Sequence, residues 1–285
     1  MLSFNRTRTG GLSQIILSVC VAVMALPSGL AFGLDLCAAI KEGQTIQVER
    51  ALAKGFSPDA PNRAGDTPLV CAVRARNTAA LVALLSRGAD VNGTDRAGFS
   101  PLFHAADTAS SEIAKLLLEN GANPNLLNLA GNAPAHISAE ADDADMIAVL
   151  ASTPAFNPDI RNAAGNTPAG IAASAGKAKV LKALLRAGAS KIVNPDLLSL
   201  AVLSASTDTV KAVLDAGYDV NLGKGRALRA AAGSGNITML RLLVASGASV
   251  DIEGDDGLTP DRYADLKRQP AAAAFIRTAR RSGGK

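Results

Sequence analysis

Length, composition and charge restrict the class of protein before any motif is considered. The chain has 285 residues, of which 48% are hydrophobic and only 3% aromatic, so its apolar content is mainly small and aliphatic. This composition excludes an intrinsically disordered chain and favours closely packed helices over an aromatic-rich β-sandwich. The net charge of +4, from 29 basic and 25 acidic residues, does not provide the clustered basic face on which nucleic-acid binding depends.

Residues 1–33 have the organisation of a cleavable export signal. Two arginines precede an apolar run over residues 15–26, and small residues follow that run. Cleavage after Ala31 and cleavage after Gly33 both fit the small-residue rule, so the site stays open. A retained membrane anchor is the alternative, although the apolar run is short for a membrane span. Either interpretation places the rest of the chain outside the cytoplasm.

A repeat of 33 residues governs the part of the chain that follows. Segments related to Gly-Asp-Thr-Pro-Leu start at Gly65, Gly98, Gly131 and Gly165, spaced by 33, 33 and 34 residues. Thr67, Ser100 and Thr167 are predicted helix N-caps, because their hydroxyls can satisfy free backbone N–H groups. The proline after each of them fits the first helical position, where a missing N–H costs nothing.

Each repeat predicts two helices and a finger. The first helix is short and Ala-rich, as in residues 69–75, and the second carries apolar residues at helical spacing, as in residues 81–85. Gly88 and its equivalents are expected to end the second helix in a left-handed conformation. The segment Asp95–Gly98 then predicts a tight turn at the tip of an extended finger.

The pattern weakens towards the C-terminus. The two repeats after Gly188 are shortened and lack Thr-Pro, so we expect stunted fingers at Asn194–Pro195 and Gly223–Gly225. Pro154 stands where other repeats have a helix-ending glycine, which predicts an irregular joint. A final motif at Leu258–Pro260 predicts a C-terminal cap.

This pattern resembles the ankyrin repeat, whose mark is Thr-Pro-Leu-His-x-Ala at a period of 33. Asp66–Leu69 and Gly88–Asn92 match it best, and the resemblance covers about residues 34–270. It implies an all-α solenoid of about seven helix-turn-helix repeats with β-hairpin fingers and a C-terminal cap. Residues 34–281 are expected to form one cooperative unit, because one repeat buries its apolar face only against its neighbours. Residues 282–285 are expected to be a disordered tail.

Few side chains suggest chemistry. His136 occupies the histidine position of the repeat, and we expect it to hydrogen bond the adjoining finger. His104 falls one position later, on the inner helix, without a cysteine or carboxylate at metal-ligand spacing. The acidic run Glu140–Asp145 fits a turn before a helix N-terminus better than a catalytic carboxylate pair. The sequence therefore predicts no catalytic residue, no metal site and no cofactor.

Cys37 and Cys71 are the cysteines that would remain after signal removal. They lie on the first helices of adjacent repeats, one position out of phase. Stacked helices lie about 10 Å apart, which is more than the Cα separation that a disulfide tolerates. We therefore expect two buried free thiols, with a disulfide as the alternative that an oxidising compartment would permit.

The resemblance implies a partner-binding surface at the finger tips and on the exposed face of the first helices. The third finger, Asn125–Leu129, carries three leucines where polar residues would suffice. Apolar anchors flanked by arginine are typical of interface hot spots. The candidate partner-binding residues are Arg63, Arg74, Arg76, Arg96, Phe99, Phe103, Asp107, Leu126, Leu127 and Leu129. The alternative is that some of these leucines pack against neighbouring fingers.

These features predict a protein-interaction module without enzymatic activity, similar to exported ankyrin proteins of Gram-negative bacteria. We expect a monomer in the periplasm that binds another protein, with no nucleic-acid partner and no membrane contact after signal cleavage. One alternative is a secreted, host-directed effector. The other is a small-ligand-binding or catalytic module in the groove between the fingers and the helices.

Overall fold

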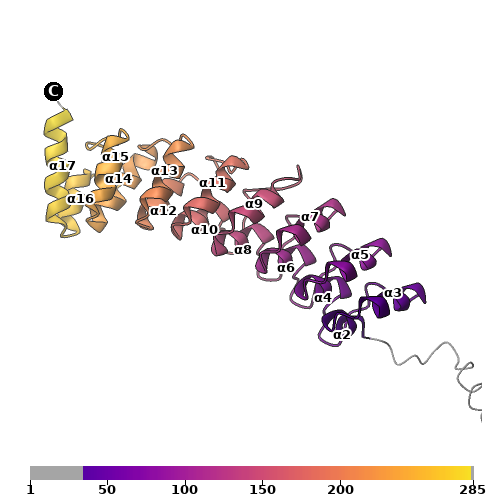
Figure 1. Cartoon of the computed structure of the whole chain (residues 1–285). Helices are drawn as coiled ribbons and strands as arrows, with labels where there is room; N and C mark the ends of the chain where they lie inside the picture. The colour runs from indigo at the N-terminus through magenta and orange to yellow at the C-terminus, as the bar shows by residue number, and fades with distance from the viewer. Residues whose placement is uncertain (1–34, 284–285) are drawn as a thin grey trace, which may run out of the picture.

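The computed structural model describes residues 35–283, and in this range the chain forms helices and turns without a β-strand (Figure 1). The helices are α2 (Leu36–Lys41), α3 (Thr45–Ala53), α4 (Pro68–Arg74), α5 (Thr78–Ser86), α6 (Pro101–Asp107), α7 (Ser111–Glu119), α8 (Pro134–Ala141), α9 (Ala144–Leu150), α10 (Pro168–Ser174), α11 (Ala178–Arg186), α12 (Leu197–Leu203), α13 (Thr207–Asp215), α14 (Leu222–Ser234), α15 (Ile237–Ala245), α16 (Pro260–Leu266) and α17 (Pro270–Gly283). The predicted export signal lies outside the described residues. Helix α17 includes part of the predicted tail, of which residues 284 and 285 also lie outside them.

The helices form two rows. The inner helices, α2, α4 and the even-numbered helices after them, make one row, and the outer helices from α3 to α17 make the other (Figure 1). Each helix packs against its partner in the pair, each inner helix packs against the next inner helix, and most outer helices do the same in their row. The buried apolar residues therefore form one continuous core from Leu36 to Ile276. This arrangement confirms the predicted solenoid of seven repeats with a terminal helix pair.

The predicted helix starts are confirmed. The hydroxyls of Thr67, Ser100 and Thr167 accept hydrogen bonds of 3.1–3.3 Å from the backbone N–H three residues later. Helix α8 starts after an alanine, and there the Nδ1 atom of His136 accepts from the N–H of Ala133 at 3.1 Å. The histidine thus satisfies the N–H of the cap residue, which is a different donor from the one that the hydroxyl caps satisfy.

Left-handed residues recur along the solenoid at the ends of outer helices, in the turns between paired helices and in the fingers. Gly88 and Gly121 end outer helices with φ values of 79° and 88°, as predicted. The turn between the two helices of each repeat also holds a left-handed residue, which the sequence pattern did not indicate. These turn residues are Gly43, Arg76, Ala109, Asp142, Gly176, Ala205, Gly235 and Arg268. Five of the eight are not glycine, so the fold imposes this conformation at some steric cost.

The fingers are tight turns rather than strand-paired hairpins. In the first finger, the side-chain oxygen of Asn62 accepts from the N–H groups of Ala64 and Asp66 at 2.9 and 3.0 Å. The backbone N–H of Asn62 donates to the carbonyl of Asp66 and closes the turn at 3.0 Å. Asp95, Asn128 and Asn162 hold the next three fingers in the same way. A single side chain therefore organises each tip without a β-ladder.

Neighbouring repeats are also joined at the base of the fingers. The carboxylate of Asp59 accepts from the N–H of Asp90 at 2.8 Å, and the amide oxygen of Asn92 accepts from the N–H of Asn123 at 2.8 Å. Each bond satisfies a backbone donor of the next repeat. The recurring Asp or Asn at this position is thus explained by stacking of the repeats.

The later repeats depart from the pattern where the sequence predicted it. Residues 223–225 all have positive φ values, between 57° and 65°, and replace a finger by a left-handed turn. Helix α9 has 7 residues, whereas α7 and α11 have 9, and turns over residues 151–155 follow it. At the C-terminal end, Arg277 and Arg280 of α17 form ion pairs with the buried Asp261 of α16.

Cys37 and Cys71 form a disulfide with a Cα–Cα distance of 5.4 Å, so the expectation of free thiols is wrong. The spacing of about 10 Å describes helix axes, whereas these two residues point towards each other from packed helices α2 and α4. Each Cα atom lies about 2.3 Å from its helix axis, so Cα atoms on facing sides of two helices are several Å closer than the axes. The bond is buried and joins the first repeat to the second.

Candidate interaction face

A groove of about 420 Å³ lies between the first two fingers and the inner helices α4 and α6. It is lined from the helices by Arg74, His104 and Asp107, and from the second finger by Arg96 and Phe99. Four of these five are predicted partner-binding residues. We define the candidate face as finger tips 60–66, 93–99 and 126–132, helices α4 and α6, and the turns that follow these helices.

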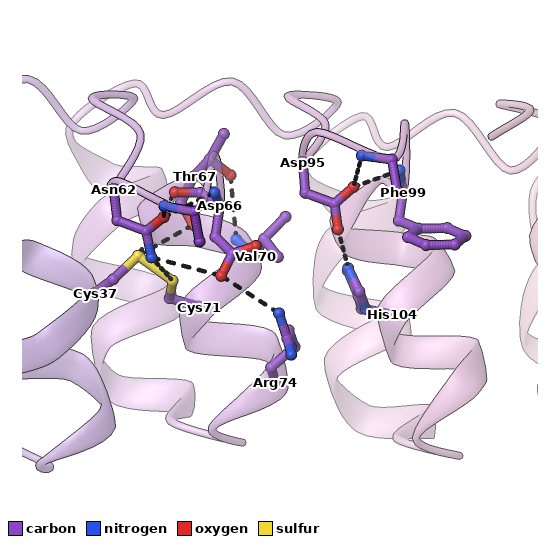
Figure 2. Close-up of polar contacts among 12 residues, drawn as sticks. Cys37, Asn62, Asp66, Thr67, Val70, Cys71, Arg74, Asp95, Phe99 and His104 are labelled. Carbon is purple, nitrogen blue, oxygen red and sulfur yellow. Dashed lines mark hydrogen bonds and ion pairs between the residues drawn. A yellow bond between two sulfur atoms is a disulfide. The ribbon is translucent and has the colours of Figure 1, made fainter. Parts of the chain in front are cut away.

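Asp66 and Arg74 form an ion pair on one side of this groove (Figure 2). The Nη1 atom of Arg74 lies 3.3 Å from the carboxylate of Asp66, which also lies 3.5 Å from the side-chain amide of Asn62. The side chain of Arg74 is 48% exposed, whereas that of Asp66 is 12% exposed. The carboxylate is thus covered, and the guanidinium reaches solvent.

Asp95 and His104 form a second pair, which sequence spacing did not reveal. The Nε2 atom of His104 lies 2.9 Å from one carboxylate oxygen of Asp95. The other oxygen accepts from the N–H groups of Ala97 and Phe99, each at 2.9 Å. Burial raises the pKa of Asp95, but the hydrogen bonds from His104, Phe99 and Ala97 lower this pKa more, and the net shift is downward. The carboxylate is therefore ionised and fully hydrogen bonded.

A signal for this pair exists in the sequence. Asp95 stands where three of the first four fingers have asparagine, and His104 stands where other repeats have Cys71, Ile137 and Ile171. Both departures occur in the same repeat, and the finger places the two positions side by side. The coincidence becomes meaningful only once the finger is known to fold back over the inner helix (Figure 2).

The two phenylalanines at this groove have different environments. Phe99 is half-buried, with its ring centroid 4.7 Å from that of Phe103 and 5.5 Å from that of His104. Phe103 is only 5% exposed, so little of its ring is available for the predicted partner contact. It occupies the third position of its inner helix, as the buried His136 does, and this position faces the neighbouring repeat.

Two of the three leucines of the third finger are exposed to solvent. Leu129 is 81% exposed and Leu127 is 43% exposed, whereas Leu126 is half-buried. The backbone of Leu129 still packs on the second finger, because its N–H donates to the carbonyl of Ala97 at 3.2 Å. A Cβ at Gly98 would lie 3.0 Å from the nitrogen of Leu129, so a glycine allows this close approach. These contacts fix the backbone of the finger, while the side chains of Leu127 and Leu129 face solvent.

Four arginines of the candidate face are exposed. Arg74 and Arg96 line the groove, and Arg63 and Arg76 lie on the adjoining finger and turn. Arg96 crosses the first finger and donates to the carbonyl of Arg63 at 3.3 Å, and Arg76 donates to the carbonyl of Thr108. These bonds hold the side chains against neighbouring repeats.

Comparison with known proteins supports this fold. Residues 36–128 match the family model of ankyrin repeats, in three copies. The structure is similar to the crystal structure of the ankyrin repeat domain of Bcl-3, described as a unique member of the IkappaB protein family. The two are 27% identical with a TM-score of 0.68, and the match covers 75% of this chain and 99% of that chain. The chain folds as an ankyrin-repeat solenoid.

No curated protein sequence matches this ankyrin-repeat chain. Ankyrin repeats generally mediate protein–protein interaction, and the fold is typically a scaffold without catalysis. The likeness to Bcl-3 therefore concerns architecture, and the chemistry of this chain must come from its own side chains.

Outside the candidate face, the remaining chemistry of the ankyrin solenoid is structural. His136 is buried, and its Nε2 atom lies 3.1 Å from the carbonyl oxygen of Asn166 in the next finger, as predicted. Burial lowers the pKa of His136, although hydrogen bonds with Asn166 and Ala133 oppose the shift. Asp143 of the acidic run caps helix α9 by accepting from the N–H of Met146 at 2.9 Å.

Two further properties belong to residues 35–283. No helix in this range is both long and apolar enough to span a bilayer. No group of three or more His, Cys, Asp or Glu side chains there has an arrangement that could hold a metal ion.

The later ankyrin repeats carry exposed apolar side chains that the sequence pattern did not single out. Ile192 of the fifth finger is 91% exposed, and Leu203 at the end of α12 is 64% exposed. Leu203 takes the place that Arg74 and Asp107 occupy on their inner helices. These two positions of the later repeats thus present apolar side chains to solvent.

Proposed function

We propose that this chain is a protein-interaction module that holds its partner on the candidate face. The observation that carries this proposal is the third finger, where Leu129 is 81% exposed beside an arginine-lined groove. Exposed apolar side chains next to arginine and an aromatic ring are typical of binding hot spots. The finger is rigidly hydrogen bonded, so little ordering entropy opposes binding.

We also propose that the chain acts outside the cytoplasm, in the periplasm of a Gram-negative bacterium. The signal-like segment at residues 1–33 supports export. The buried disulfide between Cys37 and Cys71 supports it independently, because structural disulfides persist mainly in oxidising compartments.

The location is tested by expressing the full chain with a C-terminal tag and sequencing its N-terminus after cell fractionation. We expect a periplasmic protein that starts at Phe32 or Leu34. Recovery of the intact chain from the cytoplasm would contradict export. Accumulation in the medium would favour the secreted, host-directed alternative.

The interaction is tested by affinity capture from an envelope extract with three forms of the mature protein. The parent is compared with a Leu127→Ser/Leu129→Ser variant and with an Ile192→Ser control. The control removes a side chain that is 91% exposed on a different finger. We expect one protein to be retained by the parent and the control and lost from the double variant. Equal retention by all three forms would refute the face, and loss from both variants would indicate unspecific apolar adhesion.

A further inference from the structure

We infer that the partner presents an acidic peptide segment with interspersed leucine or phenylalanine, its carboxylates binding Arg74 and Arg96 and its apolar side chains packing on Phe99 and Leu129. This inference rests on the proposed function and specifies the chemistry of the partner. Three properties of the candidate face lead to it, namely its exposed charge, its free hydrogen-bonding capacity and its uncharged third finger.

The exposed charge of the face is positive. Its exposed cationic side chains are Arg63, Arg74, Arg76 and Arg96. Asp107 is the exposed carboxylate among the described residues of this face, since Asp66 and Asp95 are covered. An approaching segment therefore meets four guanidinium groups and one carboxylate, a charge pattern that complements an acidic partner.

The free hydrogen-bonding capacity of the groove consists mainly of donors. Asp95 already accepts from two backbone N–H groups and contacts His104, and Asp66 is engaged by Arg74 and Asn62. Each guanidinium carries five N–H donors, and Arg74 and Arg96 each have one hydrogen bond in the described part of the chain. The ligand must therefore supply acceptors, and a carboxylate matches the planar guanidinium with two parallel hydrogen bonds.

The third finger determines the apolar part of the ligand. Residues 126–132 contain no charged side chain, and they present Leu127 and Leu129 to solvent. Leu129 lies against Gly98, the residue that precedes Phe99, so this apolar surface continues into the groove. A free phosphate or a small carboxylate would leave the surface uncovered. A peptide that carries both acidic and apolar side chains covers both parts.

The test uses two fluorescein-labelled 12-residue peptides and the mature protein. One peptide alternates Glu or Asp with Leu or Phe, and the other has Lys in place of each acidic residue. We expect anisotropy titrations to show binding of the acidic peptide alone, weakening as salt rises from 50 to 300 mM. An Arg74→Gln/Arg96→Gln variant should bind at least tenfold more weakly.

Two further variants separate recognition from folding. Asp107→Asn removes a repelling carboxylate and should tighten binding about twofold, an effect that misfolding would not produce. Arg186→Gln removes one arginine from outer helix α11 and should leave the affinity unchanged. Thermal unfolding of every variant confirms that the solenoid is intact.

The outcomes distinguish this inference from the proposed function. Preference for the lysine peptide, or unchanged affinity in the double arginine variant, would overturn the inference. Absence of binding by both peptides would also overturn it, and the proposed function would stand if partner capture still depended on Leu127 and Leu129. Loss of that dependence would remove the proposed function as well.

Discussion

The disulfide between Cys37 and Cys71 is predicted to fasten the first repeat to the rest of the solenoid. Within residues 35–283, the first repeat, α2 and α3, packs against the second repeat alone, so it buries less apolar surface there than an internal repeat. The bond closes a segment with a sequence separation of 34 residues. Constraint of the unfolded chain by a loop of this length contributes about 4 kcal/mol to stability. Reduction should therefore destabilise the N-terminal repeat first.

The assay follows urea unfolding by circular dichroism and hydrogen exchange by mass spectrometry, with and without reductant. We expect reduction to lower the free energy of unfolding by about 4 kcal/mol. Hydrogen exchange should rise first in residues 36–53. The first finger should follow, because the side-chain amide of Asn62 lies 3.9 Å from the sulfur of Cys71. Partner capture should then weaken, since this finger forms one wall of the groove.

A Cys37→Ala/Cys71→Ala variant is the control. Its urea unfolding and its hydrogen exchange should be the same with and without reductant. This control separates loss of the bond from other effects of the reagent. The reasoning would be refuted if the reduced parent, with two titratable thiols, kept the stability and exchange pattern of the oxidised protein. Uniform destabilisation of all repeats would refute the local fastening.

Three other predictions concern stability. Among the described side chains, the buried hydroxyl of Tyr218 has no hydrogen-bond partner, and burial raises its pKa to about 12. Because Tyr218→Phe removes this unsatisfied hydroxyl, it should raise the free energy of unfolding in urea by about 1 kcal/mol. A decrease would reveal a partner for the hydroxyl. Ala109 and Ala205 have φ values of 49° and 60°, so changing either to Gly should stabilise the protein by about 1 kcal/mol. The control Ala148→Gly, within α9, should destabilise the protein by about as much. Stabilisation in all three, or in none, would contradict the role of the left-handed turn. Burial raises the pKa of Asp261, but hydrogen bonds with Arg280 and Thr259 and the charge of Arg280 lower it more, to about 2 from an ordinary 3.8. Because the folded pKa is depressed, this carboxylate should contribute about 2 kcal/mol above pH 4, lost as the pH falls towards 2. The stability difference between the parent and Asp261→Asn should shrink over the same range, and a constant difference would exclude this origin.

The sequence was informative where the determining interactions are local. A hydroxyl residue before proline caps a helix through contacts within one turn, so Thr67 and Ser100 were predicted correctly. A glycine at the end of an outer helix was equally predictable, because the constraint is on its own φ angle. The period of 33 residues then determined the order of the elements.

The sequence was uninformative where two elements must meet. The period places Cys37 and Cys71 on adjacent helices, but their separation depends on the rotation of each helix, which turns the two side chains towards each other. Phe103 was predicted on the surface for the same reason, although its helical position faces the neighbouring repeat. Contact between Asp95 and His104 likewise depends on how the finger folds over α6.

The candidate face is best defined by what the repeat does not require. Caps, left-handed glycines and the Asp or Asn at the finger base recur because each repeat needs them to stack. Arg74 and Leu129 occupy positions where other repeats have different side chains. Ser174 stands in place of Arg74, and Arg63, Arg96 and Ala163 stand in place of Leu129. Arg74 pairs with the covered carboxylate of Asp66, which Asn62 also contacts, whereas Leu129 is 81% exposed. A stacked repeat tolerates almost any side chain there, so selection for binding can act on these positions without a large effect on stability. Replacing Leu129 should therefore alter partner capture at a small cost in folding, whereas replacing Arg74 also removes the ion pair with Asp66.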